Sequence, residues 1–208
     1  MNEISFYILI RSWKAFNTFD KCVDSVFFQT YRNFKILFVD DASPLSSKEK
    51  EHIRRRLNKH VVVFNKIRLY SLRNAYEMIW NFAVKNEAVI FNLDADDWLP
   101  DQKVLSRVAK IYKENPDCFL TYGECVLWEK NKISSKPSRF LLENVNVPYS
   151  KNIIKKGTYR KEPFYPLHPR TWKVSLFKKI NKKDFLRPDG KWLQFAEDQA
   201  IFFPLLEM

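Results

Sequence analysis

The sequence predicts an α/β protein with a mostly parallel central sheet between two layers of helices. Short apolar runs alternate with amphipathic segments through the first 115 residues, which is the pattern of strands alternating with helices. Two of the apolar runs end in acidic residues, at 40–41 and at 94–97. With 208 residues, 46% of them hydrophobic, the chain is long enough to bury a core of its own.

Runs rich in Val, Ile, Leu and Phe are predicted as strands, because they are apolar and too short for helices. These strands are 5–10, 34–40, 61–64 and 88–93. Helices are predicted where apolar residues recur every three or four positions. The first begins with Asn17 or Thr18 as its N-cap and continues to Phe27, and the others are 47–57, 72–83 and 102–112.

The pattern changes after Pro116, where a smaller mixed region begins. Short strands are predicted at 119–122 and 125–128, and helices at 174–180 and 199–208. Residues 130–161 are polar and basic without periodicity, which predicts a long loop. We expect residues 1–208 to form one domain, and the apolar C-terminal end suggests the N-terminal domain of a longer protein.

Composition limits the classes of function. The formal charge of +12 suits nucleic acid, an anionic membrane face or a phosphate-bearing substrate, but the basic residues are spread along the chain. The glycines form neither a dinucleotide fingerprint nor a P-loop, and the cysteines lack zinc-pair spacing. Neither a signal peptide nor a membrane-spanning run is seen, so we expect a cytoplasmic location.

The acidic residues after the run 88–93 indicate a metal site. Asp94 and Asp96 are two positions apart, so in a strand both side chains would point the same way. Neighbouring carboxylates repel unless a cation lies between them, and oxygen ligands suit Mg²⁺ or Mn²⁺, ions that usually also hold substrate phosphates. An alternative is that Asp97 or Asp101 is the N-cap of the next helix.

Several motifs resemble the family 2 glycosyltransferases of the GT-A fold. They are Ile8-Leu-Ile-Arg-Ser-Trp13, Gln29-Thr-Tyr-Arg-Asn-Phe-Lys35, Val39-Asp-Asp-Ala-Ser43, Leu93-Asp-Ala-Asp-Asp-Trp-Leu-Pro100, His168-Pro-Arg-Thr-Trp172 and Glu197-Asp198. The motifs occur in the family's order, and the resemblance covers nearly the whole chain. The chain departs from the family pattern at Arg11-Ser-Trp-Lys14, where relatives commonly have Thr-Tyr-Asn, and in the helix before Asp94, which lacks glycine.

The resemblance implies a donor site for a UDP-sugar in residues 1–115. In that site Arg11 and Trp13 would lie against the uridine, and Asp41 would accept a hydrogen bond from the uracil N–H. Arg68 would face the nucleotide, with Arg73 as its competitor.

The resemblance also implies a metal-dependent, inverting transfer of a sugar. Asp94 would contact the ribose and the metal, and Asp96 would bind Mn²⁺ or Mg²⁺ directly. Asp198 would be the general base that takes a proton from the acceptor hydroxyl, with Glu197 as the alternative. His168 could reach the acceptor or the diphosphate.

The same resemblance implies that residues 116–208 bind the acceptor, a glycan or glycoprotein. It implies no nucleic-acid partner. Two other functions remain open. A nucleotidyltransferase would use Asp94 and Asp96 for a metal and a triphosphate, but should have a Gly-rich loop near the first strand. A basic nucleic-acid-binding domain would cluster Lys and Arg with aromatic residues, whereas the motifs here are acidic.

Overall fold

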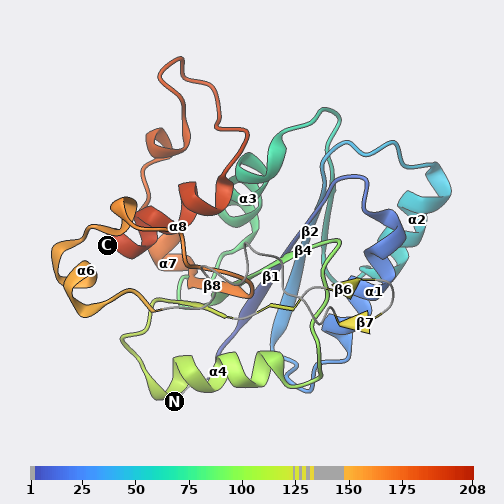
Figure 1. The fold of residues 1–208 in the computed structure, drawn as a ribbon. Coiled ribbons are helices and arrows are strands. Elements are labelled where there is room, and N and C mark those ends of the chain that lie inside the picture. Colours follow the sequence, from blue (N-terminus) through green and yellow to red (C-terminus); the bar gives the residue numbers. More distant parts are fainter. Residues whose placement is uncertain (1–2, 124, 127, 130–131, 134–147) are drawn as a thin grey trace.

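The computed structural model describes residues 3–123, 125–126, 128–129, 132–133 and 148–208 (Figure 1). Its centre is a six-stranded sheet in the order β3-β2-β1-β4-β8-β5. The strands are β1 (Phe6–Ser12), β2 (Phe34–Asp40), β3 (Val61–Phe64), β4 (Val89–Asp94), β5 (Leu120–Tyr122) and β8 (Arg170–Lys173). Strands β1 to β4 are parallel, and β8 runs antiparallel to both β4 and β5. The predicted mostly parallel sheet is confirmed.

Helices cover both faces of this sheet (Figure 1). They are α1 (Phe16–Phe27), α2 (Ser47–Arg56), α3 (Tyr70–Phe82), α4 (Val104–Glu114), α6 (Lys151–Lys156), α7 (Val174–Phe177) and α8 (Glu197–Glu207). The apolar faces of α1, α2 and α4 share one buried cluster, and those of α3, α7 and α8 share another. The three-layer α/β/α arrangement is therefore confirmed.

Strand β1 is apolar at every position from Phe6 to Ile10. Phe6, Ile8 and Ile10 pack into the cluster under α1, while Tyr7 and Leu9 pack into the cluster under α3. Successive side chains of a strand point to opposite faces, and a strand with helices on both faces must be apolar on both.

Two predicted helix caps are wrong. Helix α1 begins at Phe16 after Ala15, without a side-chain cap, and Thr18 instead donates its hydroxyl to the carbonyl oxygens of Ala15 and Ala95. Helix α4 follows Lys103, so neither Asp97 nor Asp101 is its N-cap.

The predicted loop 130–161 is also partly wrong. Residues 134–147 lie outside the described residues, but α6 is helical and a 3₁₀ turn follows at Tyr159–Lys161. The Ser150 hydroxyl caps α6, and Gly157 ends it in the left-handed conformation. The short strand predicted at 125–128 is displaced to β6 (Trp128–Glu129), which pairs with β7 (Lys132–Ile133).

The sheet brings acidic and basic residues to one edge. Because β1, β2 and β4 are parallel neighbours, their C-terminal ends coincide, with Ser12 opposite Asp40 and Arg11 opposite Asp94. In open α/β sheets ligands bind beyond this edge. The residues that the sequence singled out on separate strands therefore meet where a ligand is expected.

Candidate functional site

A cavity of about 240 Å³ opens at the C-terminal edge of the sheet. Four residues predicted for the nucleotide site line it: Arg11, Trp13, Asp41 and Arg68. The lining also includes Tyr70, Ser71 and Asn74 of α3 and residues 194–197, at the start of α8. A cavity with aromatic walls and a few polar groups suits a small organic ligand.

Asp41 is buried and holds the turn that leads into α3. One carboxylate oxygen accepts the Leu69 N–H at 2.7 Å and the other accepts the Tyr70 N–H at 2.9 Å. Tyr70 has a φ of 63°, a conformation that is unfavourable for an aromatic residue. Asn65 donates to the same carboxylate at 3.0 Å. Asp41 therefore shapes the cavity as well as lining it.

Arg68 and Arg73 differ in their surroundings. The Arg68 guanidinium lies 3.5 Å from the Trp13 ring centroid and 4.6 Å from that of Tyr70, so it stands over aromatic faces at the cavity. Arg73 points along α3 instead, where its Nε lies 3.6 Å from Glu77. Of the two candidates for the nucleotide site, only Arg68 lines the cavity.

Arg11 connects the cavity to the acidic residues. Its buried side chain places Nη2 2.9 Å from Asp94 and 3.1 Å from Glu197, and Nη1 donates to the Ser71 carbonyl oxygen at 3.4 Å. Burial alone would lower the pKa of Arg11, but the two carboxylates outweigh it and raise that pKa. A permanent positive charge therefore lies between the end of β4 and the start of α8.

The carboxylates after β4 are arranged differently from the prediction. The strand ends at Asp94, and a turn closed by the Asp97 N–H to the Asp94 carbonyl oxygen, at 3.0 Å, follows it. Strand alternation therefore does not relate Asp94 to Asp96, and the expectation that both point the same way because they share a strand is wrong. The turn brings Asp97 back toward Asp94, and both Asp96 and Asp97 are exposed.

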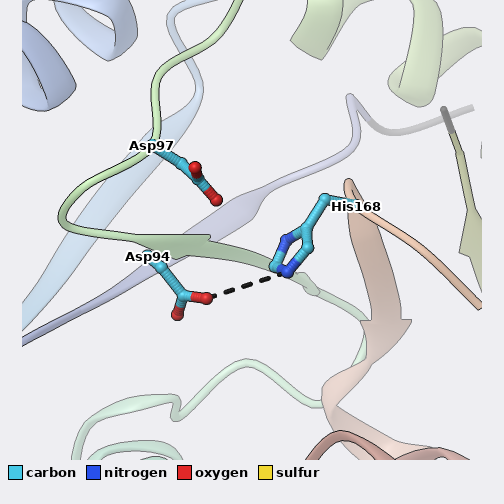
Figure 2. A group of neighbouring side chains, drawn as sticks. All are labelled: Asp94, Asp97 and His168. Carbon is cyan, nitrogen blue, oxygen red and sulfur yellow. Dashed lines mark ion pairs between the residues drawn. The ribbon is translucent and has the colours of Figure 1, made fainter. Parts of the chain in front are cut away.

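Asp94, Asp97 and His168 form a group that could hold a metal ion (Figure 2). One ligand atom from each lies within 4.8 Å of the others. Partial loss of solvent around the carboxylate, together with the like charges of Asp94 and Asp96, raises the pKa of Asp97 to about 6. Burial would raise the pKa of Asp94 too, but Arg11, His168 and Arg170 lower it. Two carboxylates and an imidazole are a donor set suited to Mn²⁺, so these residues fit such an ion.

Arg170 connects this group to α8. Its Nη2 lies 2.6 Å from His168 Nε2, and its Nη1 lies 3.4 Å from an Asp198 oxygen. Arginine has only donors, so His168 Nε2 must accept, and Nδ1 of the neutral ring carries the proton. Burial first, and then the charge of Arg170, lowers the pKa of His168 to about 4, which agrees with a neutral ring. A cation that took Nε2 would have to displace Arg170.

We refer to Asp94, Asp97, His168, Arg170 and Asp198 as the charged centre. The sequence motifs assign Asp97 no role there beyond helix capping, and they assign no role to Arg170. A signal existed for Asp97, because a turn after a strand can return the fourth residue toward the first. His168 precedes β8, which begins at Arg170, so strand alternation does not relate these two residues.

The acidic pair Glu197-Asp198 forms the first turn of α8, and its two members are used differently. Glu197 is paired with Arg11. Asp198 accepts the Gln199 N–H at 2.8 Å through one oxygen, and its side chain is one-third exposed. Of the two, Asp198 is the carboxylate more open to a substrate.

The fold is that of the GT-A glycosyltransferases. Residues 7–181 match the model of the family described as Glycosyl transferase family 2. The match covers most of the chain, which therefore belongs to that family. A search of curated sequences found no match.

Solved structures agree on the fold. The chain is similar to S. aureus TarS 1-349 in complex with UDP-GlcNAc, with a TM-score of 0.66 and 16% identity over 98% of this chain and 54% of that one. It is also similar to the mannosyltransferase PcManGT from Pyrobaculum calidifontis in complex with GDP-Man and Mn²⁺, with a TM-score of 0.59 and 13% identity over 86% and 47%. The chain thus spans about half the length of these proteins. Across the described residues, none of the helices combines the length and apolar character needed to cross a bilayer.

Proposed function

We propose that this domain transfers a sugar from a UDP-sugar to an acceptor hydroxyl with inversion at the anomeric carbon. The observation that carries the proposal is the position of the cavity. Its aromatic and acidic walls, from Trp13, Tyr70 and Asp41, adjoin the charged centre through the Arg11–Asp94 ion pair. A nucleoside in the cavity would direct its diphosphate toward that centre.

The donor is held in two parts. The uridine lies in the cavity against Arg11 and Trp13, with its ring N–H toward Asp41, and Arg68 faces the nucleotide. Asp41 has a lone pair for this purpose, because a carboxylate accepts at about four positions and hydrogen bonds from Leu69, Tyr70 and Asn65 take three. Arg68 Nε is paired with the same carboxylate at 3.7 Å, which is too long for a hydrogen bond. The similarity to proteins in complex with UDP-GlcNAc and GDP-Man supports a nucleotide-sugar donor.

A divalent cation, Mn²⁺ or Mg²⁺, would be held by Asp94 together with Asp96, as the family motif implies. Asp97 and His168 are further ligands that the geometry offers. When bound, the ion would offset the charge that develops on the leaving diphosphate. Asp94 also contacts the ribose, while Arg11 keeps its carboxylate oriented.

Asp198 is the general base. The acceptor oxygen attacks the anomeric carbon from the side opposite the diphosphate, the bond from that carbon to the phosphate oxygen breaks, and the hydroxyl proton goes to Asp198. A carboxylate can do this when it lies within hydrogen-bond reach of the hydroxyl. Asp198 is paired with Arg170, whereas Glu197 is paired with Arg11. The acceptor, a glycan or glycoprotein, would be bound by residues 116–208.

Calorimetry with UDP tests the donor and the metal together. We expect UDP to bind in millimolar Mn²⁺ and at least about tenfold more weakly in EDTA, because the cation links the diphosphate to the carboxylates. Equal affinity under both conditions would remove the metal from the proposal. A panel of UDP-sugars, with release of UDP as the readout, would then identify the sugar.

A further inference from the structure

Three side chains form a hydrogen-bonded chain along the cavity. Asn65 Nδ2 donates to an Asp41 oxygen at 3.0 Å and to Asn74 Oδ1 at 2.7 Å. Both Asp41 oxygens accept backbone N–H groups, so this carboxylate presents acceptors and Asn65 must turn its NH₂ group toward it. The same NH₂ group meets Asn74, which must therefore present its carbonyl oxygen. The orientation of the Asn74 amide thus follows from the contacts of Asp41.

The Asn74 NH₂ group consequently points away from Asn65. Asn74 is only 2% exposed, yet it lines the cavity. Within the ranges that the structure describes, the Asn65 contact is the hydrogen bond of its side chain, and its amide nitrogen is not among the atoms that are fully enclosed without a partner. The donor therefore opens onto the cavity, where a bound ligand is its available partner. A donor left without an acceptor there is unfavourable.

We infer that Asn74 reads the nucleobase by donating a hydrogen bond to an exocyclic carbonyl next to the ring N–H that faces Asp41. An acceptor from Asp41 beside a donor from Asn74 is complementary to the N–H and C=O edge of uracil. Cytosine presents the reverse pattern, a ring lone pair beside an amino group. Guanine presents the same N–H and C=O pair as uracil, so this pair of contacts does not separate those two bases. This inference rests on the proposed function, because it assumes that the cavity holds a nucleoside.

The substitution Asn74→Asp tests this inference. It retains an acceptor toward Asn65 but replaces the donor toward the cavity with an acceptor. Calorimetry in Mn²⁺ would compare UDP, CDP and GDP on the unchanged protein and on the variant. A new negative charge weakens the binding of every nucleoside diphosphate, so the readout is the ratio of the UDP affinity to the CDP affinity. We expect that ratio to fall about 10- to 100-fold.

The matched control is Asn81→Asp, which adds the same charge at an exposed position of the same helix. It should leave the ratio unchanged. Asn74→Ala, which removes the donor without adding charge, should weaken the binding of UDP and leave the affinity for CDP nearly unchanged. Thermal melts of each variant show whether the fold is kept, and Asn74→Ala decides the question if Asn74→Asp does not fold.

The outcomes separate this inference from the proposed function. An unchanged UDP to CDP ratio in a folded Asn74 variant overturns the role of Asn74 and leaves the UDP-sugar proposal standing. Preference of the unchanged protein for GDP overturns the UDP-sugar proposal, and the GDP to CDP ratio then tests Asn74 in the same way. Absence of binding by all three nucleotides overturns both.

Discussion

The cavity wall and the charged centre are built on opposite principles. In the wall, two backbone N–H groups and an amide N–H fix the Asp41 carboxylate, and the Asn74 donor left without a partner opens onto the cavity instead of being enclosed. The charged centre and Arg11 beside it differ, because they enclose polar atoms without partners. Buried nitrogen atoms there lack partners among the described residues, namely Arg11 Nε, His168 Nδ1 and Arg170 Nε. The carboxylates of Asp94 and Asp97 also lie close together.

This difference indicates which part of the site is preformed. Satisfied polar groups stabilise a single geometry, whereas buried groups without partners cost free energy. The wall is therefore ready to receive a flat ring. The charged centre retains an electrostatic cost that a diphosphate and a cation would relieve. Substitutions should accordingly affect stability at the wall and at Arg11, which joins the two regions, and chemistry at the charged centre.

The largest effect is expected for Asp198→Asn. The amide can still accept the Gln199 N–H, but it cannot take a proton at neutral pH. Transfer to a verified acceptor should fall by about 10²- to 10⁴-fold, while UDP affinity by calorimetry and the melting temperature stay unchanged. Near-normal transfer would remove Asp198 from the role of base, and Glu197→Gln would be measured next.

A large effect on stability is expected for Arg11→Met, which retains the apolar volume but leaves Asp94 and Glu197 without their shared cation. Breaking a buried ion pair costs about 3–5 kcal/mol. We expect the lower end, since both carboxylates are partly exposed. Urea unfolding would measure it, and Arg160→Met, at an exposed pair with Glu207, is the control, expected to cost less than about 1 kcal/mol. Equal costs would show that the Arg11 pairs add no more than a surface ion pair.

A smaller effect is expected for Asp41→Ala, because the N–H groups of Leu69 and Tyr70 lose their acceptor. The free energy of unfolding should fall by about 1–3 kcal/mol, and UDP should bind more weakly because the cavity wall is displaced. Asp41→Asn, which retains one acceptor oxygen, should have a free energy of unfolding between those of the unchanged protein and of Asp41→Ala. A normal melting temperature with weakened UDP binding would mean that Asp41 acts on the ligand alone.

Local sequence patterns determined most of the fold. Strands β2 and β3 have the predicted bounds, because a short run of β-branched and aromatic residues between turn residues favours a strand over other structures. The three-layer order followed from alternating periodicities. Helix starts were less predictable, as at α1, where the tertiary contact of Thr18 with Ala95 replaces a local cap.

The candidate site was predicted only in part, for a physical reason. Sequence motifs named Arg11, Asp41 and Asp94, since residues at the ends of parallel strands must meet at one edge. The sequence by itself thus determined the fold class, the edge of the sheet and the acidic character of the site. The contacts of Arg170 with Asp198 and of His168 with Asp94 join different segments of the chain, and the orientation of Asn74 depends on Asp41 and Asn65. Only the tertiary structure decided these, because hydrogen-bond direction depends on which donors and acceptors fold against each other.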